Sequence, residues 1–315
     1  MQEAAELLGA ADVVALRLLG DLLSGRHDGL AGVVVCNDPM ADLRLSYVLR
    51  ILADRGRLRF PVHLLDAPRG GGAHRGRFVA RQYARLAGFV SGITGRPADA
   101  TTLAEAAAAE SALGRGLTQV RDQRCARTLS GTAALAAYRL AAQTAPAQAL
   151  GRIADLLSAA DMPSSGTGAA VPVYLTGSSH PDATVYAELE AAGAVVVGED
   201  HDAGDAAWVG ETADAASLED ACRLLAEQHA LRPPSAARSL SAGRTRHLLA
   251  ELRRTGAAGV VALVRDLDDG PVWDLAEQRR ALAGTGTWLA EAVRVPADGA
   301  AEAAADLTAR LQPAG

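Results

Sequence analysis

Short, fully apolar segments separated by amphipathic helices are the feature that most restricts the fold of this chain. Residues 30–37 (LAGVVVCN) and 59–68 (RFPVHLLDAP) flank a helical pattern at 42–53, which predicts a βαβ unit. Uniformly apolar strands are typical of parallel sheets that are buried on both faces. Because such crossovers are right-handed, we expect the loop after the first strand at the carboxyl edge of the sheet, where open α/β sheets bind ligands.

The second half of the chain repeats this alternation. We expect strands at 171–179 (VPVYLTGSS), 194–202 (AVVVGEDHD), 259–269 (GVVALVRDLDD) and 287–296 (TWLAEAVRVP), with helices at 182–192, 218–229, 242–255 and 273–284. A parallel, doubly wound sheet is the simplest architecture for this order. The loops after the first three strands should therefore share one rim.

The remaining segments set the expected domain organisation. Residues 5–23 predict one amphipathic helix, and residues 75–160 are almost wholly helical, with breaks at 95–99 and 130–132. The Pro-, Ser- and Gly-rich stretch 161–170 has the composition of an exposed hinge. We expect a shortened α/β domain plus a helical segment at 1–160, and a second doubly wound domain at 171–315.

Composition excludes several classes of function. The net charge is −6 and aromatic residues make up 3% of the chain, which argues against nucleic-acid binding. All 31 basic residues are arginine, so Schiff-base and P-loop lysine chemistry are excluded. No apolar run approaches the ~20 residues that span a bilayer, and the N-terminus lacks the basic region of a secretory signal, so we expect a cytoplasmic protein.

The cysteines do not form a recognisable framework. The three of them (Cys36, Cys125 and Cys222) include no CxxC pair, so neither a disulfide scaffold nor a zinc finger is predicted. We expect each to be a small buried apolar residue.

Acidic residues gather in two of the loops on the expected rim. One loop carries Glu199, Asp200, His201, Asp202 and Asp205, and another carries Asp266, Asp268 and Asp269. Carboxylates with one imidazole can bind a hard cation or transfer protons. Acidic residues in such loops also serve simply as helix caps, and both interpretations remain open.

Two glycine-containing loops are candidate anion sites. Gly177, Ser178 and His180 lie between a strand and a helix, where free backbone N–H groups favour an anion, although a plain helix cap explains the serine equally well. The run at 69–72, RGGG, could admit a phosphate or be a connector. Neither the dinucleotide fingerprint G-x-G-x-x-G nor the nucleophile elbow G-x-S-x-G is present.

The order of these segments resembles the two-subunit 2-hydroxyacyl-CoA dehydratase and benzoyl-CoA reductase family. The resemblance is carried by GVVVCNDPMADLRLSYVLR with Arg44 and Tyr47, RTLSGTAALAAYRLAAQ, VPVYLTGSS, GAVVVGEDHDAGD and the stretch that ends in VALVRDLDD. It implies two flavodoxin-like α/β domains with a helical segment between them, the first domain being shortened at its N-terminus. It further implies three cysteines that hold a four-iron four-sulfur cluster, which passes an electron to an acyl-CoA thioester.

The cluster-ligand positions of that family fall here on Met40, Asp202 and Asp268, none of which is a thiolate. Iron in such clusters is held by anionic sulfur, so we expect no cluster in this chain. The resemblance then favours a cluster-free subunit of a dehydratase or reductase complex over an independent catalyst. This subunit would pair with a cluster-bearing homologue or with itself, and it would contact an acyl thioester or acid through Ser178, Gly177, His180, Asp38 and Met40.

Two other hypotheses remain. One is an enzyme that uses acid–base or metal chemistry in the same cleft, with Asp202 or Asp268 as the base or metal ligand, His201 as a proton carrier and Ser178 in an oxyanion or phosphate site. The other keeps a cluster with Cys36 and two ligands that are not cysteine.

Overall fold

The computed structural model describes residues 2–37, 42–68, 71–159, 170–180, 182–201, 203–207, 210–211, 214–236, 239–296 and 298–309. The chain forms two compact units. The first comprises Met1–Ala107 with Thr212–Arg232, and the second comprises Ala108–Glu211 with Pro233–Gly315. Each is described separately below.

The first unit contains the predicted βαβ arrangement. Strands β1 (Val33–Cys36) and β2 (Val62–Leu65) pair in parallel, and α3 (Asp42–Asp54) connects them. Helices α1 (Gln2–Leu8), α2 (Val13–Leu23) and α3 bury a core around Leu19, Leu49 and Phe60. The long helices α4 (Ala73–Thr94) and α9 (Leu218–Ala230) pack against each other, although they lie far apart in the sequence.

The prediction of one continuous helix over 5–23 is wrong. Gly9 adopts a left-handed conformation (φ 69°) that ends α1, and Asp12 starts α2 by accepting a hydrogen bond from the Val14 N–H at 2.8 Å. A left-handed glycine at one helix end and a side-chain cap at the next start are the usual signals of a helix break.

The second unit is built on a four-stranded sheet. Its strands are β3 (Val171–Gly177), β4 (Ala194–Glu199), β5 (Gly259–Arg265) and β6 (Trp288–Val295), all parallel and in the order β4-β3-β5-β6. This order matches the first four strands of a flavodoxin-like sheet. The predicted α/β class with parallel sheets is confirmed.

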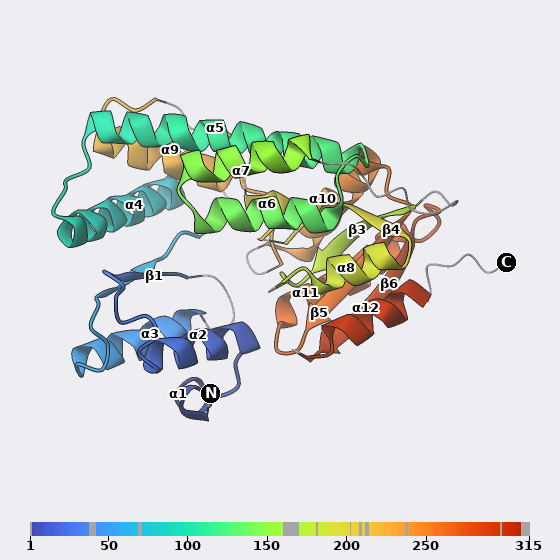
Figure 1. Ribbon diagram of the computed structural model, residues 1–315, viewed down its shortest axis with the longest axis horizontal. Helices are drawn as coiled ribbons and strands as arrows, with labels where there is room; N and C mark the ends of the chain where they lie inside the picture. The colour runs from blue at the N-terminus through green and yellow to red at the C-terminus, as the bar shows by residue number, and fades with distance from the viewer. Residues whose placement is uncertain are drawn as a thin grey trace. The chain divides into compact units, whose positions relative to one another are not determined.

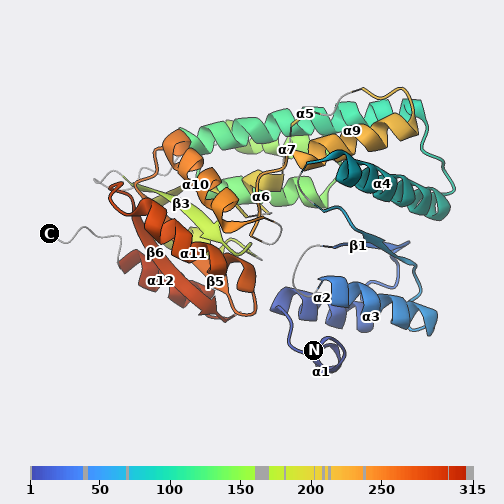
Figure 2. The same ribbon diagram turned by 180° about the vertical axis from the view of Figure 1, so that it is seen from behind.

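Helices cover both faces of this sheet, as uniformly apolar strands require (Figures 1 and 2). On one face α8 (Thr184–Ala191) and α12 (Ala300–Ala309) pack on Val173, Leu175 and Val196. On the other face α10 (Ser241–Thr255) and α11 (Asp269–Leu282) cover Tyr174 and Val260. Helix α12 is not predicted by the sequence analysis, and α11 begins four residues before the predicted helix.

Three helices of the predicted helical segment have their own core in the second unit. Helix α5 (Ala100–Cys125) packs with α6 (Gly131–Gln143) and α7 (Pro146–Ser158) around Val120, Tyr138 and Ile153. The predicted breaks near 95–99 and 130–132 are present, and a further break separates α6 from α7. Except for Ala170, the expected hinge at 161–170 lies outside the described residues, so the predicted domain boundaries remain a prediction.

Candidate functional site

The loops after β3 and β5 meet at the carboxyl edge of the second sheet. Ser178 Oγ donates a hydrogen bond of 2.6 Å to Asp268 Oδ2 and accepts one of 3.0 Å from the Arg265 N–H. Gly177 makes this close approach possible, because it has φ 110° and a Cβ there would lie 2.3 Å from the Leu263 carbonyl oxygen. Asp268 is also the residue that immediately precedes α11. The two predicted candidates Ser178 and Asp268 are therefore in direct contact.

A buried ion pair lies at the same edge of the sheet, directly after the end of β4. Thr176 Oγ1 donates to both oxygens of Asp200, at 2.9 and 3.0 Å. Arg244, which is 1% exposed on α10, lies 3.6 Å from Asp200 Oδ1 and donates to Asp274 Oδ2 at 3.0 Å. Burial alone would lower the pKa of Arg244, but Asp200 and Asp274 raise it, so the guanidinium stays charged.

A second set of buried polar groups, which we term the Arg124 cluster, lies beside β4. Its five members are Arg124, Tyr138, Tyr186, Glu199 and Asp205. Arg124, at the end of α5, is completely buried and donates to both Glu199 and Asp205. Tyr138 of α6 donates to Asp205, and Tyr186 of α8 donates to Glu199 at 2.9 Å. The cluster thus joins three helices to the end of one strand.

The charges of the Arg124 cluster stabilise one another. Burial alone would lower the pKa of Arg124, but the carboxylates of Asp205 and Glu199 raise it well above its usual value. Burial would raise the pKa of Asp205, whereas Arg124 lowers it, with Arg121 adding to the effect. Burial raises the pKa of Tyr138 and of Tyr186 well above the ordinary value, so both remain neutral hydroxyl donors.

Two histidines extend this cluster. The His201 ring lies with its Nε2 atom 2.7 Å from the Tyr186 hydroxyl, and the His180 ring meets His201 edge to face at 5.4 Å between centroids. Burial, followed by the nearby His201 and Arg265, holds the pKa of His180 well below its usual value. His180 is therefore a neutral imidazole inside the second unit.

The structure brings some of the predicted site residues together and buries most of them. His201, Ser178 and His180 are 3%, 1% and 6% exposed. Asp268 is half-buried next to Ser178. Asp38, Met40 and Asp202 lie outside the described residues, so nothing is added to the prediction for them.

Sequence analysis missed the basic and phenolic members of this edge. Arg124, Tyr138, Tyr186 and Arg244 lie on four helices, and nothing in their spacing relates them to the acidic loops. The sequence does contain one indirect signal. Glu199 and Asp200 directly continue an apolar strand, and carboxylates that are buried at such a place need cationic partners from elsewhere in the fold.

The cysteines occupy three different environments. Cys36 is exposed at the end of β1, Cys222 is buried on α9 and Cys125 is partly buried at the end of α5. The prediction of a buried apolar role is confirmed for Cys222 and is wrong for Cys36, whose strand end is open to solvent. The Cys125 thiol donates a hydrogen bond to the Arg254 carbonyl oxygen at 3.7 Å.

Of the three positions that the resemblance assigns to cluster ligands, Asp268 is the one that lies within the described residues, and its carboxylate accepts a hydrogen bond from Ser178. Across the described ranges, no three His, Cys, Asp or Glu side chains converge in a way that could hold a metal ion. Within the same ranges, no helix has the length and apolar character needed to span a membrane.

Comparison with known protein families gives a match over most of the chain. The family model described as 2-hydroxyglutaryl-CoA dehydratase, D-component, matches residues 31–283, which include β1 and β2 and the strands β3, β4 and β5 of the second sheet. No curated protein matches the chain.

Proposed function

The chain belongs to the 2-hydroxyglutaryl-CoA dehydratase D-component family, and from this premise we propose that it is a dehydratase-type subunit without an iron–sulfur cluster of its own. In this proposal it forms a heterodimer with a cluster-bearing homologue and supplies contacts to the acyl thioester. The electron-transfer chemistry then belongs to the homologue.

The observation that carries the proposal is the side chain found at a position that the family resemblance assigns to a cluster ligand. Asp268 stands where a thiolate is needed and accepts a hydrogen bond from Ser178. A carboxylate held in this way is a poor replacement for the soft sulfur ligand that iron–sulfur clusters use. Cys125 and Cys222 lie on helices: the Cys125 thiol donates a hydrogen bond to the Arg254 carbonyl oxygen, and burial raises the pKa of the Cys222 thiol.

The main alternative is an independent enzyme that uses Asp and His as acid and base. Burial supports the subunit proposal over this one. His201, the expected proton carrier, is 3% exposed and lies 2.7 Å from the Tyr186 hydroxyl inside the unit, so its ring does not face a substrate in this conformation. A general acid or base must reach the proton that it transfers.

The test is anoxic purification of the chain alone, of a cysteine-bearing family member from the same organism, and of the two co-expressed. We expect co-elution as a stable complex, with iron and acid-labile sulfide per complex equal to that of the homologue alone. Iron and sulfide bound to this chain by itself, or no complex with any cysteine-bearing homologue, would refute the proposal.

A second arm separates the alternative from the proposal. Asp268→Ala is expected to leave the rate of 2-hydroxyglutaryl-CoA dehydration by the complex within about twofold, because in this proposal the homologue carries the electron-transfer chemistry. Loss of dehydration of a hundredfold or more with assembly intact, the range typical of a removed acid–base group, would favour the acid–base enzyme.

A further inference from the structure

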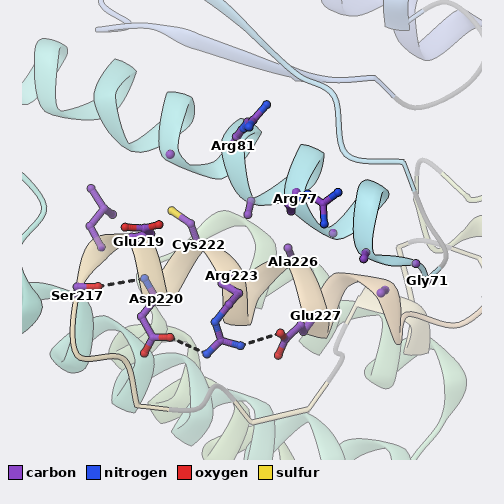
Figure 3. A pocket seen from close by; sticks show the side chains of 17 residues that line it. Gly71, Arg77, Arg81, Ser217, Glu219, Asp220, Cys222, Arg223, Ala226 and Glu227 are labelled. Carbon is purple, nitrogen blue, oxygen red and sulfur yellow. Dashed lines mark hydrogen bonds and ion pairs between the residues drawn. The ribbon is translucent and has the colours of Figure 1, made fainter.

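A furrow runs along the packed helices α4 and α9 inside the first unit, with a volume of about 1140 Å³ (Figure 3). Small side chains line it at every fourth residue of both helices: Gly76, Ala80 and Ala84 along α4, with Gly72 just before its first residue, and Cys222, Ala226 and Ala230 along α9. Residues four apart lie on one helix face, so each row forms a continuous seam about 12 Å long. Small side chains allow another helix to approach closely.

The two walls of the furrow carry opposite charge. On the α4 side lie Arg77 and Arg81, and this helix contains no acidic residue. Within the part of the chain that the structure describes, Arg81 forms no ion pair. On the α9 side lie Glu219, Asp220 and Glu227.

The single arginine on the α9 side does not change the sign of that wall. Arg223 is already bonded to Asp220 at 2.6 Å and to Glu227 at 2.7 Å (Figure 3). Glu219 has no such partner among the described side chains. The α9 wall is therefore net negative, while the α4 wall is positive.

Cys222 forms part of the floor. It is 4% exposed, its thiol makes no hydrogen bond to any described residue, and Figure 3 shows its sulfur between the two helices. Burial raises the pKa of this thiol, so the floor stays uncharged. A furrow with an uncharged floor and two oppositely charged walls is complementary to a binding partner that has an apolar stripe with charged residues on both sides of it.

We propose that the furrow receives an amphipathic α-helix of the partner subunit. This inference rests on the proposed function, because the occupant is the cysteine-bearing homologue. The docking helix would contact the furrow over about two turns, with a seam of small or aliphatic residues. It would carry carboxylates on the flank that faces α4 and basic side chains on the flank that faces α9.

The shape of the furrow favours a helix over a small molecule. Small-molecule pockets combine apolar walls with a few buried polar groups that converge on the ligand. The charged groups here are exposed and lie along the two rims. The small residues of the floor are spaced four apart, which is the spacing of the ridges on a helix.

The test uses pairs of matched variants on α4. Gly76→Leu fills the furrow, whereas Gly88→Leu makes the same change outside it, and no atom lies within 4 Å of the added Cβ at either position. Arg81→Glu reverses a rim charge, and Arg85→Glu makes the same change on the same helix outside the furrow. Each variant is titrated against the cysteine-bearing homologue by calorimetry, with circular dichroism as a check on folding.

We expect Gly76→Leu and Arg81→Glu to weaken the complex at least tenfold, with Gly88→Leu and Arg85→Glu within twofold of the wild type. If the wild type binds and all four variants bind equally well, the furrow is not the docking site, although the proposed function stands. If the wild type binds no homologue, the proposed function itself fails. If the wild type self-associates and Gly76→Leu alone makes it monomeric, the occupant is a second copy, and the assignment to the partner subunit is wrong.

Discussion

Arg124 is the residue on which the buried edge of the second sheet most depends. Its guanidinium has no exposure and is shared by Glu199 and Asp205. Removing one partner of a buried ion pair leaves an uncompensated charge, which is far more destabilising than losing an exposed pair.

Arg124→Met is accordingly expected to lower the free energy of unfolding by about 3–5 kcal/mol. The matched control is Arg115→Met on the same helix, because Arg115 pairs with Glu211 and both side chains are about 60% exposed. That control should lose about 1 kcal/mol or less. Denaturant titration measures both, and an equal loss in the two variants would contradict the structural role assigned to Arg124.

His180 gives the protein a predictable dependence on pH. Its pKa is held well below 6.5 in the folded state, first by burial, so in mildly acidic solution the unfolded chain binds a proton that the folded one does not. The titration of His180 leaves the free energy of unfolding unchanged above the pKa of this histidine in the unfolded chain. Below about pH 6.5 the free energy of unfolding falls, by at most about 1.4 kcal/mol per pH unit.

The comparison that tests this uses denaturant titrations of the wild type, His180→Leu and the exposed control His74→Asn between pH 7.5 and pH 5. We expect the free energy of unfolding of the wild type and of His74→Asn to fall between pH 7.5 and pH 5. The fall should be smaller in His180→Leu. Identical pH profiles in all three proteins would show that His180 does not control this window.

At the scale of elements, Glu190 joins α8 to the start of α6. Its carboxylate accepts hydrogen bonds from the Gly131 N–H at 2.5 Å and from Thr132 Oγ1 at 2.7 Å. A negative charge at a helix N-terminus interacts favourably with the free N–H groups and the helix dipole. Gly131 is needed for this contact, since a Cβ there would lie 2.6 Å from Val196.

Glu190→Ala should therefore destabilise the protein by about 1–2 kcal/mol, whereas Glu188→Ala, exposed on the same helix, should change it by less than about 0.5 kcal/mol. Thermal unfolding followed by circular dichroism distinguishes the two. If Glu190→Ala unfolds at the same temperature as the wild type, solvent replaces the hydrogen bonds of the carboxylate without loss of stability.

At the scale of the whole molecule, each hydrophobic cluster stays within one unit. The cluster around Leu19 and Leu49 belongs to the first unit, and those around Tyr138, Leu175 and Leu248 belong to the second. Separate cores allow separate unfolding transitions.

The three tryptophans (Trp208, Trp273 and Trp288) all belong to the second unit, so their fluorescence reports on that unit alone. Circular dichroism reports on the helices of both. We expect the two signals to give different denaturation midpoints, and coincident midpoints would show that the units unfold as one.

The sequence alone determined the strands, most helices and the parallel α/β class, because apolar periodicity is a local property of the chain. It also placed Ser178 and Asp268 on one rim, since parallel strands end at the same edge. Only the tertiary structure decided that Arg124 and Arg244 neutralise the buried carboxylates, that α5–α7 share a core of their own in the second unit, and that α4 and α9 form a furrow. The ion pairs and the contacts between α4 and α9 join residues from 30 to more than 130 positions apart, and no local pattern records which distant side chains come to lie together.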